Sequence, residues 1–138
     1  MVRLALRIIA VLTAFAVLMT VPIVLRFMTN GGIAALLRTG VFGFLTVLSW
    51  LLTLLVGPFA AVQLWRLRAS GRRATAFLAA YTTIYYASGL VFFRGPDTNV
   101  AVVVFMVAIN AAASVFLLSG HARVQCGEAA REMEVRLE

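Results

Sequence analysis

The sequence predicts an all-α fold: an integral membrane four-helix bundle with both termini in the cytoplasm and a short amphipathic helix in the C-terminal tail. Composition is the first reason. Of the 138 residues, 63% are hydrophobic and only 12% are charged, against about 25% charged residues in a typical soluble domain. The second reason is that the charges leave four long uncharged segments, and the third is that the arginines are divided unequally between the two ends of those segments.

The four uncharged segments are long enough to cross a membrane. They run over 8–25, 39–65, 74–93 and 98–120. A helix that rises about 1.5 Å per residue needs about 20 apolar residues to span a hydrocarbon core of about 30 Å, and each segment is close to that length or longer. Residues 1–120 are therefore predicted to form a four-transmembrane-helix domain, with spans at about 5–25, 39–65, 74–93 and 98–120, followed by a cytoplasmic tail at 121–138.

Two alternatives to four retained helices fit the sequence poorly. Transmembrane strands alternate apolar and polar residues, whereas residues 101–109 are apolar throughout. A signal peptide cleaved after Ala16 would have an apolar core of only Ile8–Thr13, shorter than the roughly 7–15 residues expected. The first span is therefore predicted to be a retained helix.

The arginines predict the orientation, because positively charged short loops stay on the cytoplasmic side of a membrane. The N-terminal segment, the loop between the second and third spans, and the tail together hold nine arginines, whereas the other two loops hold three. Both termini are therefore predicted to be cytoplasmic.

Short polar segments are predicted to connect the spans. Asn30-Gly31-Gly32 is a turn signal, and Ile33–Leu37 is predicted to be a short interfacial helix. Ser70-Gly71 is predicted to be the centre of a tight turn between the second and third spans. Arg94–Asp97 is predicted to form a tighter turn, which makes the third and fourth spans antiparallel neighbours.

The tail is predicted to be helical from Ser119 onward, because its apolar side chains recur every three or four residues. A short amphipathic helix of this kind either lies on the membrane or docks a partner, and the pattern leaves both open. The apolar stripe consists of Cys126, Ala130, Met133 and Leu137.

The residue inventory argues against an autonomous enzyme. No Asp, Glu, Lys or Arg lies deep within a predicted span, whereas proton-coupled pumps need an ionisable group there. A single cysteine forms no intramolecular disulfide, and a single histidine offers one of the two axial ligands that a membrane haem takes. We therefore expect no catalytic residue, metal or cofactor. We also expect no nucleic-acid binding, because the arginines are spread along helix ends.

Four uncharged polar residues are predicted to lie near the bilayer midplane: Thr53, Tyr85, Tyr86 and Asn110. Because the third and fourth spans are neighbours, a hydrogen bond from Asn110 to Tyr85 or Tyr86 is geometrically reasonable. In one interpretation these residues hold helices together, at about 0.6 kcal/mol for each interaction. In the other they line a small polar cavity for an uncharged solute. The first interpretation is favoured.

The second span carries a stripe of small residues at intervals of four: Ser49, Thr53, Gly57 and Ala61. Such a stripe lets another helix approach closely, within the monomer or in an oligomer. Pro58 lies within the stripe and is predicted to kink the helix, because it cannot donate a hydrogen bond to the carbonyl of Leu54.

An aromatic and basic cluster is predicted at the cytoplasmic interface, beside the loop between the second and third spans. It is interpreted either as a site for anionic lipids or an acidic partner, or as a determinant of topology and anchoring alone. The second interpretation is favoured. The cluster consists of Trp65, Arg66, Arg68, Arg72 and Arg73.

The segment 61–74, with the sequence AVQLWRLRASGRRA, resembles a loop that recurs in small bacterial four-helix membrane proteins of unassigned function. In those proteins a helix ends in an aromatic and basic turn, and the next helix begins after paired arginines. The resemblance covers this loop and its flanks. It implies a location in the bacterial cytoplasmic (inner) membrane and transfers no active-site residue.

Three functions follow as hypotheses. The leading one is a small multi-pass accessory or interaction protein, a subunit or assembly partner in a membrane complex, acting as a homo- or hetero-oligomer. The alternative is a homo-oligomeric channel or carrier for a small neutral solute, based on the midplane polar residues. The third is a lipid- or quinone-binding membrane protein. The bilayer itself, including anionic lipids, is the expected environment in all three.

Overall fold

The structure, a computed structural model, describes residues 1–92 and 99–127, and over these ranges the chain folds into helices with no strand. The prediction of an all-α chain is confirmed for this part of the molecule. Three of the helices (α1, α3 and α5) are long and apolar enough to cross a membrane. The helices are α1 (Val2–Thr29), α2 (Gly32–Leu37), α3 (Val41–Trp65), α4 (Ala69–Phe92), α5 (Val100–Leu118) and α6 (Gly120–Gln125).

Helix α4 corresponds to the third predicted span, but it is not among those three apolar helices. Its 24 residues give it a length of about 36 Å. Its composition is more polar, since hydroxyl side chains recur along it: Thr75, Tyr81, Thr82, Thr83, Tyr85, Tyr86 and Ser88. α4 packs against α3 on one side and α5 on the other, so the most polar long helix is also the most enclosed.

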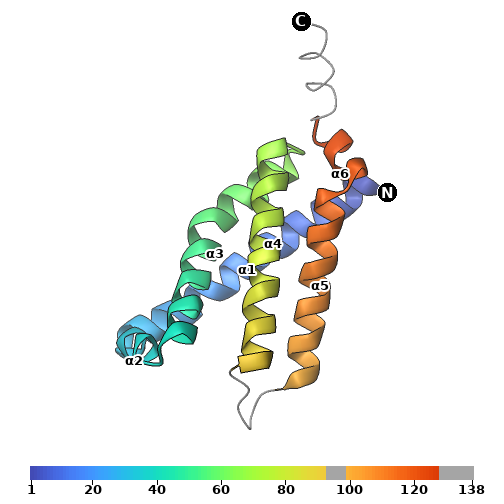
Figure 1. Cartoon of the computed structure of the whole chain (residues 1–138). Coiled ribbons are helices and arrows are strands. Elements are labelled where there is room, and N and C mark those ends of the chain that lie inside the picture. Colours follow the sequence, from blue (N-terminus) through green and yellow to red (C-terminus); the bar gives the residue numbers. More distant parts are fainter. Residues whose placement is uncertain (93–98, 128–138) are drawn as a thin grey trace, which may run out of the picture.

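The long helices pack in the order α1, α3, α4, α5. In Figure 1, α3, α4 and α5 stand side by side, and α1 runs obliquely across them from α6 at one end to α2 at the other. α1 packs chiefly along α3, and its first turns also meet α6. The short helix predicted at Ile33–Leu37 is confirmed as α2, which packs against α3 and α1.

The contact between α1 and α3 runs along most of both helices. Near its middle, a Cβ atom placed on Gly57 would lie 2.5 Å from Cγ2 of Val17. Further along, the rings of Phe27 and Trp50 lie 5.0 Å apart. The predicted small-residue stripe thus serves packing within the monomer at Gly57, and Ala61 of the same stripe is also buried.

The turn between α3 and α4 lies earlier than predicted. The backbone N–H of Arg68 donates to the carbonyl of Gln63 at 2.9 Å, and Leu67 adopts a left-handed conformation with φ 54°. This arrangement is a Schellman motif, which closes the end of a helix. Ser70 and Gly71 therefore lie in the first turn of α4, which begins at Ala69, five residues before the predicted span.

Gly71 has a different function from the one predicted. A Cβ atom at this position would clash with the backbone of Leu64 and Gln63. The glycine therefore allows the start of α4 to approach the end of α3 closely, rather than allowing the chain to turn.

The other boundaries differ by a few residues. α1 continues to Thr29, beyond the predicted end at residue 25, and α5 begins at Val100 and ends at Leu118. The turn predicted at Arg94–Asp97 lies outside the described residues, as do Ala130, Met133 and Leu137 of the predicted tail stripe. Pro58 lies inside α3, and the kink there stays a prediction.

Candidate functional site

Five helices converge at one end of the molecule. A buried apolar cluster joins the first turns of α1, the end of α3, the start of α4, the end of α5 and α6. We call this region the basic end and define it as residues 2–10, 63–76 and 114–126. Figure 1 shows its location, where the N-terminus lies beside α6. The buried cluster consists of Leu6, Ala10, Leu64, Ala76, Leu117, Ala122 and Cys126.

Arg72 lies inside the basic end rather than on its surface. Only 3% of the residue is exposed, and its Nη1 donates a hydrogen bond of 2.6 Å to the carbonyl of Leu117. That carbonyl belongs to the last turn of α5, where carbonyl groups have no partner within the helix and where the helix dipole favours a cation. Arg72 therefore joins α4 to α5. This corrects its grouping with the surface arginines of the loop.

Ser119 directs the chain from α5 into α6. Its hydroxyl donates to the carbonyl of Phe116 at 2.6 Å and accepts from the backbone N–H of Ala122 at 3.4 Å. The resulting bend brings α6 against the start of α1, where Nε of Arg3 donates to Oε1 of Gln125 at 2.7 Å. The first and last described helices are therefore joined at the basic end.

The remaining arginines of the basic end are exposed, and we call them the arginine rim: Arg3, Arg7, Arg66, Arg68, Arg73 and Arg123. The guanidinium of Arg7 lies 5.3 Å from the ring centre of Trp65, which is itself 50% exposed. This is a cation–π contact between α1 and α3. Residues 1–92 and 99–127 contain no Asp or Glu.

The polar residues predicted near the midplane are only partly brought together. Tyr85 and Tyr86 are adjacent on α4, with ring centres 5.4 Å apart. The hydroxyl of Tyr85 shares a 3.0 Å hydrogen bond with Oγ1 of Thr46 on α3, and Phe42 stacks on the same ring at 5.7 Å. Tyr81 also bridges these helices, since its hydroxyl donates to the carbonyl of Leu45 at 3.1 Å. These contacts connect α3 to α4.

The other two predicted members bond within their own helices. Oγ1 of Thr53 donates to the carbonyl of Ser49 at 2.8 Å, and Nδ2 of Asn110 donates to the carbonyl of Met106 at 2.8 Å. The expected hydrogen bond from Asn110 to Tyr85 or Tyr86 is therefore wrong.

The register of α4 against α5 explains that error. Oγ of Ser114 donates to the carbonyl of Ala76 at 3.4 Å. Four residues earlier on α5, Asn110 is then opposite Ala80 in this antiparallel pair, more than one helical turn from Tyr85. Depth counted from the nearest charges therefore misplaced Asn110 relative to Tyr85.

Thr46 is the site residue that sequence reasoning missed, although a signal was present. α3 and α4 are joined by a tight turn at Arg66–Arg68, so residues at similar distances before and after it face each other. Thr46 and Tyr85 lie at such positions.

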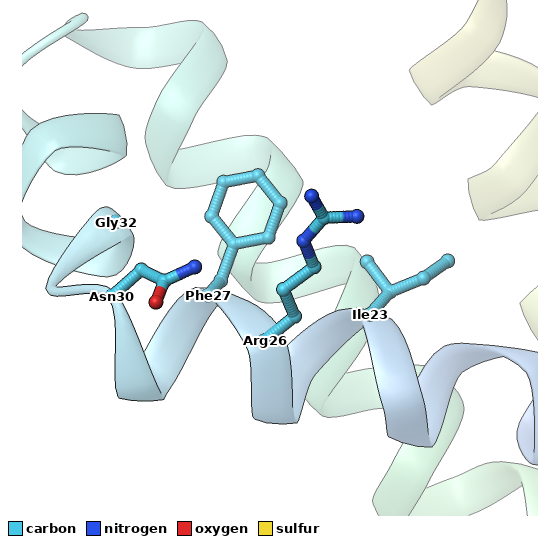
Figure 2. A pocket seen from close by; sticks show the side chains of 5 residues that line it. All are labelled: Ile23, Arg26, Phe27, Asn30 and Gly32. Atoms are coloured by element: carbon cyan, nitrogen blue, oxygen red, sulfur yellow. The ribbon is translucent and has the colours of Figure 1, made fainter.

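A shallow hollow of about 380 Å³ lies at the other end of the molecule, between the end of α1 and the start of α2. Figure 2 shows the guanidinium of Arg26 extending between the side chains of Phe27 and Ile23. Asn30 supplies the other polar side chain, and Gly32 completes the lining. Neither here nor elsewhere in the described ranges do three His, Cys, Asp or Glu side chains gather to hold a metal.

Comparison of the chain with protein-family models, with curated proteins and with solved structures found no match.

Proposed function

We propose that this chain is a small accessory or interaction protein of a membrane complex, a four-helix bundle embedded in the bacterial inner membrane. The proposal rests on the hydrogen-bond partners of the interior polar groups, which lie on neighbouring helices. Arg72 binds the carbonyl of Leu117, Tyr85 binds Thr46, and Ser114 binds the carbonyl of Ala76. Each of these groups connects one helix to the next. This is the chemistry of a scaffold, which favours a subunit or assembly partner over a catalyst.

The distribution of arginines supports an orientation with both termini in the cytoplasm. The segments expected to be cytoplasmic all meet at the basic end, as the bond between Arg3 and Gln125 illustrates. Arg26 and Arg38 lie near α2, which Figure 1 shows at the opposite end. A single transmembrane arrangement therefore satisfies the positive-inside rule for all the described helices.

The helix faces that remain open suit contact with lipid and with partner helices. α1 and α5 expose large apolar side chains over much of their length, including Leu18 and Val115. In a bilayer such faces contact acyl chains or the helices of another subunit. A homo- or hetero-oligomer formed through these faces is part of the proposal.

The channel alternative is less well supported. Thr53 and Asn110 bond to their own helices, and Tyr85 bonds to Thr46. The predicted polar layer is therefore divided between separate contacts, whereas a solute pathway needs polar groups that face a common space.

The proposal is tested by photo-crosslinking in the native membrane. A photoreactive residue replaces Leu18 on α1 or Val115 on α5, both of which are exposed. Purification in mild detergent is expected to yield a crosslinked protein from at least one of these positions. The control is an unrelated small membrane protein that carries the same probe. A chain that migrates alone as a monomer, with no crosslink from either position, would contradict the proposed function.

A further inference from the structure

Three helices of the basic end carry charge and apolar surface in the same order along the helix axis. An exposed arginine is followed, one turn toward the middle of its helix, by a large apolar side chain that is about half exposed. Residues four apart lie on one face of a helix, about one turn from each other. The pairs are Arg7 with Val11 on α1, Arg66 with Val62 on α3, and Arg73 with Phe77 on α4.

Arg66 belongs to this geometry although it ends its helix. Its backbone N–H donates to the carbonyl of Val62 at 3.1 Å. Because this bond joins residues four apart, as in an α-helix, Arg66 lies one turn from Val62. Each pair therefore places a cation near the end of a helix and an apolar side chain one turn closer to the middle of that helix.

Trp65 indicates the depth of the arginine rim in the membrane. Tryptophan is enriched where the hydrocarbon core meets the headgroups, because its ring is apolar and its N–H is polar. The half-exposed ring of Trp65 is contacted by Arg7 and is followed directly by Arg66. With Trp65 at this boundary, Arg7 and Arg66 beside it are expected at the level of the lipid phosphates.

We propose that the arginine rim, together with Trp65, binds anionic phospholipids of the adjacent leaflet. Guanidinium groups at headgroup level hold the phosphate and glycerol headgroup, because their planar donor fork matches phosphate oxygens. The acyl chains of the same lipid lie against Val11, Val62 and Phe77.

The paired arrangement favours a lipid over an acidic protein. From the membrane surface inward, a phospholipid has a negatively charged headgroup and then two long apolar chains. Each arginine and its apolar neighbour follow the same order, with the cation first. An acidic segment of a soluble partner would satisfy the arginines and leave Val11, Val62 and Phe77 uncovered by it. This inference does not depend on the proposed membrane complex, because it concerns the chain and the bilayer alone.

The test uses the tryptophan of the rim as a reporter in purified, reconstituted protein. The chain has two tryptophans, so Trp50→Phe leaves Trp65 as the reporter. Its fluorescence is measured in vesicles that contain phosphatidylglycerol or phosphatidylcholine, dibrominated near the headgroup end of the acyl chains. Brominated phosphatidylglycerol is expected to quench Trp65 at a lower mole fraction than brominated phosphatidylcholine. Arg66→Gln with Arg68→Gln is expected to reduce this preference by up to about five-fold for each arginine removed.

The matched control is Arg26→Gln with Arg38→Gln, which removes the same charge at the opposite end and is expected to leave the preference unchanged. Circular dichroism is used to check that both double variants keep the helical content of the parent. Equal quenching by the two lipids, or an equal loss of preference in both double variants, would overturn the proposal. A protein crosslink that is lost in Arg66→Gln with Arg68→Gln, together with equal quenching by both lipids, would assign the rim to an acidic protein instead. The proposed membrane complex would then stand.

Discussion

The two ends of the molecule are held together in different ways. At the basic end, five helices meet around Leu6, Leu64 and Leu117, whose side chains are fully buried. At the opposite end, α1 and α2 meet α3 beside a shallow hollow, and large side chains such as Val41 and Met28 are exposed. The end that carries most of the charge is therefore also the end with the tightest apolar core. This combination arises because all but one of its arginines lie outside that core.

The more polar helices of this protein are not the more exposed ones. α1 is among the most apolar helices, yet only 6% of its membrane-length segment is buried, whereas the more polar α4 is enclosed by α3 and α5. In lipid an apolar face needs no cover, whereas a hydroxyl or guanidinium group needs a partner. Four substitutions test the close packing and the polar contacts at the basic end and between the helices that extend from it.

The largest effect is expected for Gly71→Ala at the basic end. The new Cβ atom clashes with the backbone of Leu64 and Gln63, which cannot move aside as a side chain would. We expect a loss of about 3 kcal/mol in the free energy of unfolding, measured by denaturation in mixed detergent micelles. Gly120→Ala is the matched control, because its Cβ atom meets no atom within 4 Å. Equal stability of the two variants would contradict the close approach of α3 and α4.

The next effect is expected for Arg72→Met, which keeps an unbranched apolar side chain and removes the guanidinium group. Loss of the bond to Leu117 leaves a buried carbonyl without this donor, at a cost of about 2 kcal/mol. The same unfolding measurement applies. Arg68→Met, at an exposed position in the adjacent turn, is expected to change stability by less than about 0.5 kcal/mol. A similar cost at both positions would mean that charge, and not the buried bond, stabilises the basic end.

A smaller effect is expected midway between the two ends, at the contact of α1 with α3. Gly57→Ala places a Cβ atom 2.5 Å from Cγ2 of Val17 and is expected to cost about 1.5 kcal/mol. Val17→Ala in the same chain removes the clashing methyl groups and is expected to restore most of the loss. A double-mutant cycle measures this coupling. Additive effects would show that Gly57 does not face α1.

The smallest effect is expected for Tyr85→Phe, in the polar contact between α3 and α4. It removes the hydroxyl that pairs with Thr46 and is expected to cost about 0.6 kcal/mol. Thr46→Val is expected to cost a similar amount, and the double variant little more than either single one. Transport of a small neutral solute that disappears in Tyr85→Phe, with unfolding unchanged, would favour the channel alternative.

Sequence reasoning predicted the composition of the site better than its geometry. It placed Trp65 and four arginines of one loop together, and the structure locates all five at the basic end. It did not separate Arg72 from the others, because its burial depends on which side of α4 faces α5. It missed Thr46 for a related reason, since the pairing with Tyr85 depends on the exact position of the α3–α4 turn.

The sequence by itself determined that long apolar helices form, approximately where they begin and end, and where the charges gather along the chain. These properties are local: a backbone in lipid must satisfy its own hydrogen bonds, and long runs of apolar residues do so as helices. Only the tertiary structure decided which arginine is buried, which glycine allows a close approach, and which hydroxyls meet. Those outcomes depend on the rotation and register of each helix against its neighbours, and a shift of a single residue turns a side chain by about 100° around its helix.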